Sequence, residues 1–151
     1  MASVTDLRAG KVDKPVNAGA QHYVLNAAIS WLDRWARDGA RPPAAPRLQV
    51  SNGRFVTDEA GNALGGVRTP HVDVPVAVLS GLGNSGGPVA FLAGTTTALS
   101  ADALRSRYPT PAAYQEQFEE ATARAVTAGF LLPADTAEIA AIAAINRPDF
   151  G

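Results

Sequence analysis

Apolar positions recur at steps of three and four residues from Tyr23 onward, which predicts an amphipathic helix over residues 17–39. Asn17 is the candidate N-cap of this helix, and Gly39 is the candidate glycine that ends it. Trp31 and Trp35 are four residues apart and therefore share one face. We interpret the two tryptophans as core anchors, with ligand stacking as the alternative.

Short strands are predicted after the proline-rich connector at 41–46. Residues 47–50 and 54–57 flank an Asn52-Gly53 pair that is typical of a tight hairpin turn. Valines alternate at positions 72, 74, 76 and 78 and predict a further strand over 72–79, with Pro70 and Pro75 making it an edge strand or two pieces joined at a bend. Residues 89–92 are also predicted as strand, and residues 94–97 as a hydroxyl-rich turn.

Helical patterns return in the last third of the chain. Ser100 is a candidate cap for a short helix that ends near residue 108. Thr110, followed by Pro111, predicts the start of a longer helix that stops at Gly129. A further helix follows Asp135, which has a glutamate three residues later. The apolar faces of these helices carry the predicted core residues Tyr114, Phe118, Ala121, Ala125, Ile139, Ile142 and Ala143.

These elements predict an α+β fold: an N-terminal amphipathic helix, small antiparallel hairpins or a small sheet, and C-terminal helices. Residues 1–16 show no periodicity and are predicted to be a flexible arm. Residues 17–146 are predicted to form one α+β domain, because about 150 residues suffice for a single hydrophobic core. Residues 147–151 are predicted to be a frayed tail.

Composition narrows the classes of function. The formal net charge is −1 and the basic residues are scattered, which argues against nucleic-acid binding. The chain has no cysteine and only two histidines, so we expect neither a metal site nor a cofactor. Its apolar runs are too short to span a membrane, and no signal peptide is visible at the start. We therefore expect a cytoplasmic protein.

One stretch has the form of a catalytic motif. Gly83, Ser85 and Gly87 formally match the G-x-S-x-G pattern that presents a nucleophilic serine between a strand and a helix. The residues that follow predict a strand, so we interpret Ser85 as an ordinary loop residue. His71 and His22 are the only candidate imidazole bases, and Asp73 is the candidate acid.

The order of several segments resembles the C-terminal part of a bacterial alpha/beta hydrolase domain-containing family. The segments are GAQHYVLNAAISWLDRWARDGARPPAAPRL at 19–48, GNALGGVRTPHVDVPVAVLSGLGNSG at 61–86, FLAGTTT at 91–97 and RYPTPAAYQEQFEEATARAVTAGFLLPAD at 107–135. The resemblance implies that the hydrolase core, with its serine, acid and histidine, lies upstream of these segments. It also implies that residues 17–39 form the last long helix packing on a hydrolase sheet.

The sequence therefore favours a C-terminal segment of an esterase-type protein that is not catalytic on its own. One alternative is a stand-alone module that binds a small ligand or a protein through the loops at 81–97. A second alternative is a minimal serine hydrolase using Ser85. A helix without its sheet would expose apolar surface. We therefore expect self-association, or binding to a separate hydrolase-core chain, through the Trp31/Trp35 face, with neither nucleic acid nor membrane as a partner.

Overall fold

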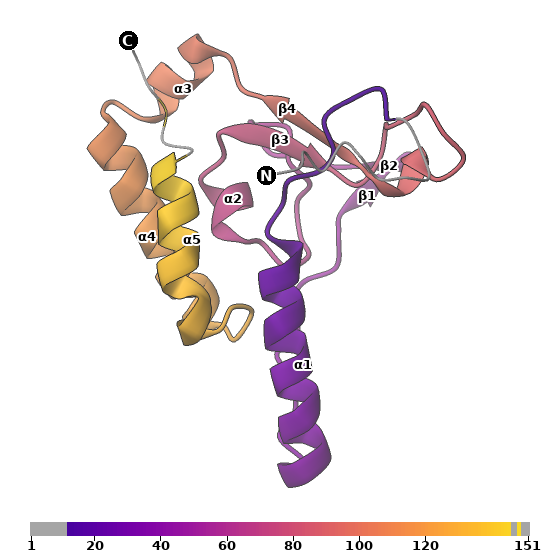
Figure 1. Cartoon of the computed structure of the whole chain (residues 1–151), viewed down its shortest axis with the longest axis vertical. Helices are drawn as coiled ribbons and strands as arrows, with labels where there is room; N and C mark the ends of the chain where they lie inside the picture. The colour runs from indigo at the N-terminus through magenta and orange to yellow at the C-terminus, as the bar shows by residue number, and fades with distance from the viewer. Residues whose placement is uncertain (1–11, 146–147, 149–151) are drawn as a thin grey trace.

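A computed structural model describes residues 12–145 and residue 148. Within these ranges, five α-helices and two antiparallel two-stranded sheets confirm the predicted α+β class (Figure 1). The α-helices are α1 (Gln21–Asp38), α2 (Pro70–Asp73), α3 (Ala101–Arg107), α4 (Pro111–Thr127) and α5 (Thr136–Ile145). The strands are β1 (Val50–Ser51), β2 (Arg54–Phe55), β3 (Ala77–Ser80) and β4 (Thr95–Ala98), and short 3-10 turns cover η1 (Ala90–Leu92) and η2 (Pro133–Asp135).

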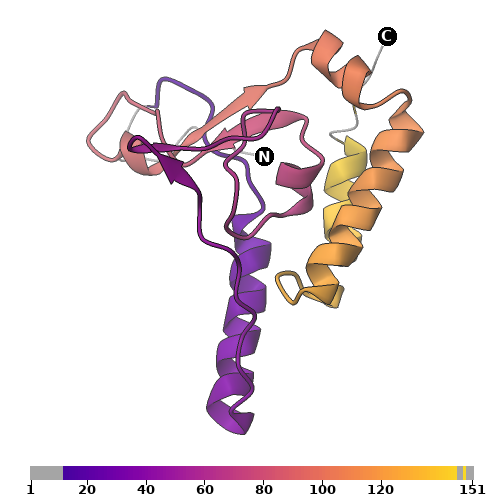
Figure 2. The same ribbon diagram turned by 180° about the vertical axis from the view of Figure 1, so that it is seen from behind.

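The long helix α1 begins four residues later than predicted. Asn17 is not its N-cap, because the Asn17 side chain accepts a hydrogen bond from the Gly19 amide at 2.8 Å and donates one to the Ser80 carbonyl at 3.0 Å. Gly39 ends the helix as predicted, with φ +68° and its amide bonded to the Trp35 carbonyl. The chain then turns back along α1 through the proline-rich connector, which Figure 2 shows from behind.

The predicted strand over 72–79 is wrong in its first half. Pro70 stands at the first position of α2, where its fixed φ suits a helix, and the Val72 and Asp73 amides both bond to the Thr69 carbonyl. Pro75 then prevents α2 from continuing, because the residue before a proline disfavours helical geometry. Only Ala77–Ser80 forms the strand β3.

The two sheets differ in how well the sequence predicted them. β1 and β2 pair around Asn52 and Gly53, whose φ angles of 50° and 73° suit a tight hairpin turn and confirm the predicted hairpin. β3 pairs antiparallel with β4 in the register Ala77 to Ala98. The predictions of a turn at 94–97 and a strand at 89–92 were both wrong. The β-branched threonines form β4, and residues 90–92 form the turn η1.

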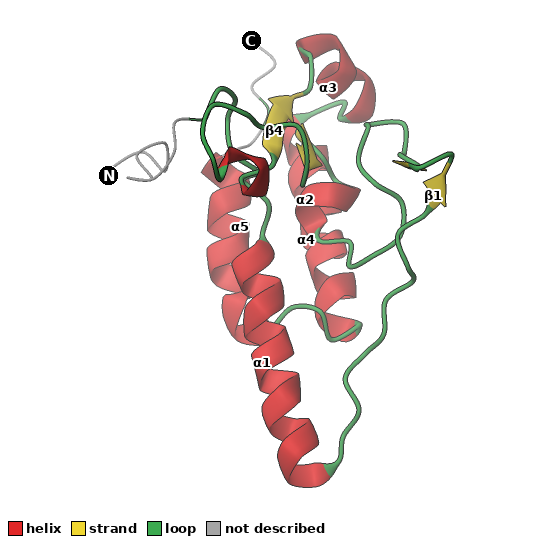
Figure 3. Cartoon of the chain, turned by 90° about the vertical axis from the view of Figure 1, so that its right-hand side faces the viewer, coloured by secondary structure: helices red, strands yellow, loops and turns green. Residues whose placement is uncertain are grey.

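The core lies where α4 and α5 pack against α2 and the first turns of α1 (Figure 3). Ser100 and Thr110 cap α3 and α4 through their side-chain oxygens, as predicted. The chain enters α5 directly from η2, and the Asp135 carboxylate accepts a hydrogen bond from Asn26. The fully buried members of this core with the largest side chains include Tyr23, Tyr114, Phe118, Leu131 and Ile139.

The predicted division into arm, domain and tail stays a prediction. Residues 1–11, 146–147 and 149–151 lie outside the described ranges. The described end of the arm is hydrogen-bonded to the body: the Asp13 amide bonds to Ser85, and the Pro15 carbonyl accepts from Thr96. The segment from residue 13 to residue 18 therefore runs beside β4 and the loop that precedes it.

Candidate functional site

Ser85 lies in an exposed loop between β3 and η1, and its hydroxyl donates a hydrogen bond to the Asp13 carboxylate at 2.9 Å. A nucleophile elbow needs a strained turn that leads straight into a helix. Among the described residues, the only non-glycine residue with positive φ is Asn52, and the three-residue turn η1 begins five residues after Ser85. The formal motif therefore has neither the strained backbone nor the helix of an elbow.

The neighbouring Asn84 organises this loop. Its side chain is 8% exposed and donates to the carbonyls of Lys14 and Gly94, at 3.1 and 2.7 Å. Its oxygen accepts from the amides of Lys14 and Ser85, at 3.3 and 3.0 Å. A buried amide with its hydrogen bonds made in this way fixes the backbone around it. The sequence analysis missed Asn84, because its partner Lys14 is seventy positions away.

His71 lies on α2, not at the entrance to a long strand. Its ring meets the Phe118 ring edge-on, with the centroids 5.2 Å apart. The Nδ1 atom is buried and has no hydrogen-bond partner within the described part of the chain. His71 is thus packed against the core, and one of its polar atoms has no partner there.

The pKa of His71 lies below its ordinary value of 6.5, because burial disfavours the charged imidazole and the nearby His22 repels a second positive charge. The unfolded chain therefore binds more protons than the folded one between the two pKa values, and stability falls as the pH drops below about 6.5.

Replacing His71 by phenylalanine is expected to flatten this dependence, because phenylalanine cannot take up a proton. Urea unfolding of both proteins at about pH 7 and about pH 5 measures it. The wild type should lose more stability than His71→Phe across this interval. Equal losses in the two proteins would contradict the buried-imidazole account.

His22 is exposed on the first turn of α1, with its ring 3.7 Å from the Tyr23 ring. Tyr23 itself is buried, and its hydroxyl has no hydrogen-bond partner within the described ranges. Burial and the nearby Glu138 carboxylate raise the pKa of Tyr23. His22 helps to lower the pKa of His71, but the His22 side chain itself lies on the surface of α1.

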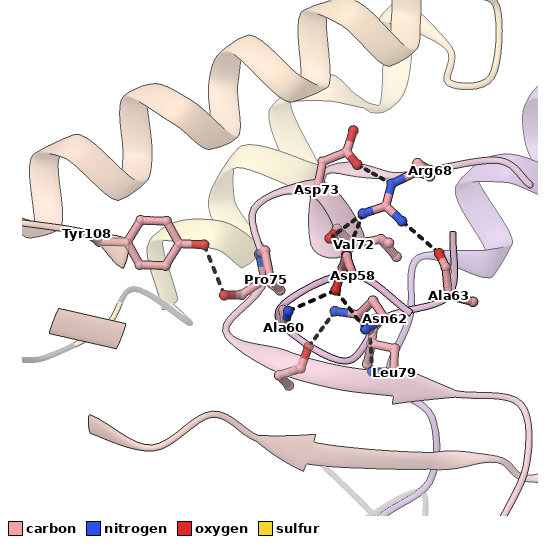
Figure 4. A network of polar contacts seen from close by, with 11 residues as sticks. Asp58, Ala60, Asn62, Ala63, Arg68, Val72, Asp73, Pro75, Leu79 and Tyr108 are labelled. Carbon is pink, nitrogen blue, oxygen red and sulfur yellow. Dashed lines mark hydrogen bonds and ion pairs between the residues drawn. The ribbon is translucent and has the colours of Figure 1, made fainter. Parts of the chain in front are cut away.

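Asp73 is engaged with Arg68, whose Nε donates to it at 2.5 Å (Figure 4). The same guanidinium donates to the Asp58 carboxylate at 2.8 Å and to the backbone carbonyls of Ala63 and Val72. Burial opposes ionisation of Asp58, but the hydrogen bond and charge of Arg68, together with hydrogen bonds from the Asn62 and Ala60 amides, outweigh it and lower the pKa of Asp58. Arg68 therefore cross-links α2 to the segment that follows the hairpin, and the sequence analysis missed this role.

The four candidate residues are not brought together as a triad. α2, which carries His71 and Asp73, precedes β3, whereas the loop that carries Ser85 leaves its far end. Four strand residues span about 13 Å. The recorded side-chain partner of Ser85 is Asp13, and that of Asp73 is Arg68. Among these four side chains, no hydrogen bond or ion pair joins any two within the described ranges, and His22 affects His71 only by helping to lower its pKa.

Two other properties of the described residues bear on function. No group of three or more histidine, aspartate or glutamate side chains in the described ranges is placed to hold a metal ion. None of the helices described for the chain combines the length and the apolar character needed to cross a membrane.

The outer side of α1 carries an unusual apolar face. Trp31 packs inward: its Nε1 donates to the Gly129 carbonyl at 2.8 Å, and the Arg34 guanidinium lies 4.2 Å from the centre of its ring. A groove of about 330 Å³ runs between this part of α1 and the proline-rich connector. Leu32 and Trp35 also line this groove, and from them an exposed apolar stripe at helical spacing continues around the outer surface of α1; its members are 55–59% exposed and are Leu25, Ile29, Leu32 and Trp35. We call these four residues the α1 stripe. Trp35, at 55% exposed, is therefore not the core anchor that the sequence predicted.

The described residues thus define a mixed α+β protein whose longest helix is covered on one side only. The sequence matches the model of the family described as "Alpha/beta hydrolase domain" over residues 2–141. The chain therefore belongs to the alpha/beta hydrolase domain family, which confirms the family resemblance found in the sequence. Comparisons with curated proteins and with solved structures found no match.

Proposed function

We propose that this chain is a non-catalytic segment of an esterase-type alpha/beta hydrolase, and that the α1 stripe docks on the sheet of a hydrolase core lying outside the described residues. The observation that carries the proposal is the stripe itself. Four large apolar side chains lie on one side of a helix whose opposite side is already packed. A helix that is apolar on both sides is typical of one buried between two layers.

Family membership supports the choice of partner. Enzymes of the α/β-hydrolase fold present their serine at the top of a central sheet, and helices cover the faces of such sheets. The sheets in the described residues have two strands each, so neither is a central sheet of that kind. Each stripe residue is about half exposed, and covering it would contribute roughly 1 kcal/mol. The stripe as a whole would contribute roughly 4 kcal/mol.

The docking proposal can be tested by co-expressing the full chain with a polypeptide that carries the catalytic core of an α/β hydrolase of the same family. We expect the two to co-purify as a 1:1 complex. Leu32→Gln should weaken the complex at least tenfold, because it places an amide in an apolar interface. Arg37→Gln, at an exposed position of α1 outside the stripe, is the matched control and should leave the affinity unchanged.

Two outcomes would contradict this partner. One is a symmetric dimer of this chain through the stripe, seen by sedimentation equilibrium and disrupted by Leu32→Gln, with no affinity for the core. The other is a complex with the core that Leu32→Gln does not weaken. Either result would assign the stripe to another occupant.

Treatment of the purified chain with a fluorophosphonate probe should give no stoichiometric adduct by intact mass. The physical reason is that the hydroxyl of Ser85 is bonded to a carboxylate and has no imidazole among its recorded partners. Circular dichroism of the same sample serves as the control for folding. An adduct that is lost in Ser85→Ala would contradict the non-catalytic proposal and favour a minimal serine hydrolase.

A second candidate function is binding of a ligand or partner by the loops at 81–97. The specific observation in its favour is a group of exposed apolar side chains in this loop: Leu82, Val89, Phe91 and Leu92 are 46–73% exposed. Asn84 holds the loop in shape, as a binding surface requires. A ligand-dependent rise in melting temperature that Phe91→Ser abolishes would support this candidate over docking by α1.

A further inference from the structure

The groove beside α1 is continuous with the α1 stripe. It lies between α1, the proline-rich connector and the segment that follows α4, where Phe130 lines it. Leu32 and Trp35 belong both to the stripe and to the groove, whereas Leu25 and Ile29 belong to the stripe alone. A partner that covers the whole stripe therefore also meets the groove.

The lining of the groove is apolar and rich in rings. None of the described residues that line it carries a charge. Five of them have ring side chains: Trp31, Trp35, Pro42, Pro43 and Phe130. Burying an unpaired charge against such walls is strongly unfavourable, so the occupant that fits them is uncharged and apolar.

One wall of the groove is already fixed in the chain alone. The Trp31 Nε1 donates to the Gly129 carbonyl at 2.8 Å, and the Arg34 guanidinium lies 4.2 Å from the centre of the Trp31 ring. Gly129 has φ +80°, and a Cβ there would lie 3.1 Å from the Trp31 side chain and 3.2 Å from Pro43. Glycine thus permits this close approach. A preformed wall needs little further ordering when a partner binds.

The groove has room for an aromatic side chain. Its volume is about 330 Å³, whereas an engineered apolar cavity of about 150 Å³ takes up benzene. Paired rings gain attraction beyond the burial of apolar area, so these walls favour an aromatic occupant over an aliphatic one of similar size. Aromatic residues are also enriched at protein interfaces.

We propose that the groove receives an aromatic side chain, phenylalanine or tryptophan, from the hydrolase core, and that this ring anchors the docking surface. The inference rests on the docking proposed for the α1 stripe, and it names the chemistry of the contact that the partner makes. The ring packs against Trp35 and Phe130, and the stripe beside it excludes water from the contact, as the surroundings of an interface hot spot do.

The first measurement titrates the full chain with N-acetyl-phenylalanine amide, and with N-acetyl-alanine amide as the matched probe without a ring. Nuclear magnetic resonance should show the Trp35 indole signal shifting with the phenylalanine probe only. It should also show contacts between the ring protons of the probe and the methyl group of Ala28, which lines the groove. A phenylalanine probe that affects these two residues no more than the alanine probe does would overturn the proposal.

Ala28→Phe is the blocking variant for the complex with the hydrolase core. Ala28 is exposed and lines the groove outside the stripe, so a ring attached there fills the groove. We expect the affinity for the core to fall about tenfold, as when an interface loses a hot-spot contact. Ala44→Phe adds the same ring at an exposed connector position outside the groove and should leave the affinity unchanged. Phe130→Ala removes one wall and replaces Ala28→Phe if that variant does not fold.

Leu25→Gln, in the stripe but outside the groove, separates this inference from the docking proposal. A complex that Leu25→Gln weakens and a folded Ala28→Phe does not would overturn the aromatic anchor and leave the docking standing. Absence of any complex between the wild-type chain and the core would overturn the docking and the anchor with it. A dimer of this chain that Ala28→Phe disrupts would also overturn the anchor, because it assigns the groove to a second copy.

Discussion

Replacing Phe118 by alanine is expected to lower the free energy of unfolding by about 3–5 kcal/mol, the largest effect we predict for a single substitution. The side chain is 2% exposed and lies on α4, with the His71 ring 5.2 Å away and the Tyr114 ring 5.8 Å away. Its removal deletes a buried ring and leaves a cavity that the surrounding helices can close only partly. Urea unfolding followed by circular dichroism measures the change.

Phe91→Ala is the matched control for this substitution. Phe91 is 63% exposed on the turn η1, so the same truncation there should change the free energy of unfolding by no more than about 0.5 kcal/mol. Similar losses in the two variants would mean that α4 does not form the centre of the core. A loss confined to Phe118→Ala would support the arrangement in which α2, α4 and α5 share one apolar interior.

Replacing Asn62 by alanine is expected to cost about 2–4 kcal/mol, although the residue lies outside any helix or strand. Its side chain is 1% exposed and acts as an extra partner for β3 (Figure 4). The Asn62 oxygen accepts from the Leu79 amide at 2.8 Å, and its nitrogen donates to the Ala77 carbonyl at 3.3 Å. Alanine would leave both backbone groups of β3 without these bonds, and each unsatisfied buried group costs about 1–3 kcal/mol.

Asn26→Ala is the control for Asn62→Ala. The Asn26 side chain is exposed on α1 and makes one surface hydrogen bond to Asp135 at 3.2 Å, so its loss should cost less than about 1 kcal/mol. Thermal unfolding of the two variants gives a second measure beside urea. Equal shifts in the midpoint temperature would contradict a structural role for the Asn62 amide.

The comparison of sequence with structure separates local from long-range information. The helix caps at Ser100 and Thr110, the hairpin at Asn52 and the core face with Phe118 were all predicted correctly, because each depends on residues within one or two turns of the chain. The alternating valines after Pro70 were misleading. Pro70 begins the short helix α2 and Pro75 follows it, and the alternation of valines did not predict this helix.

The contacts of the candidate site could not be predicted from the sequence, because they join residues that are far apart along the chain. The partner of the Ser85 hydroxyl is Asp13, 72 positions away, and Asn62 meets β3 across a separation of 15–17 positions. No local sequence pattern predicts such contacts. Arg68 could have been singled out as a lone cation between two aspartates, Asp58 and Asp73, each within ten positions. A charge placed among apolar segments is often there to hold them together.

The contact between residues 15–18 and β4 limits how far the chain can be shortened from its N-terminal side. The Pro15 carbonyl accepts from the Thr96 amide, and the Thr96 hydroxyl bonds to the backbone at Val16 and Ala18, so residues 15–18 shield one edge of the second sheet. A version of the chain shortened to begin at Gly19 would keep all the helices of the described residues but leave that edge uncovered. Open strand edges recruit other strands. Expression of α1 onward would therefore favour aggregates, whereas retention of the seven residues from Val12 to Ala18 would keep the edge closed.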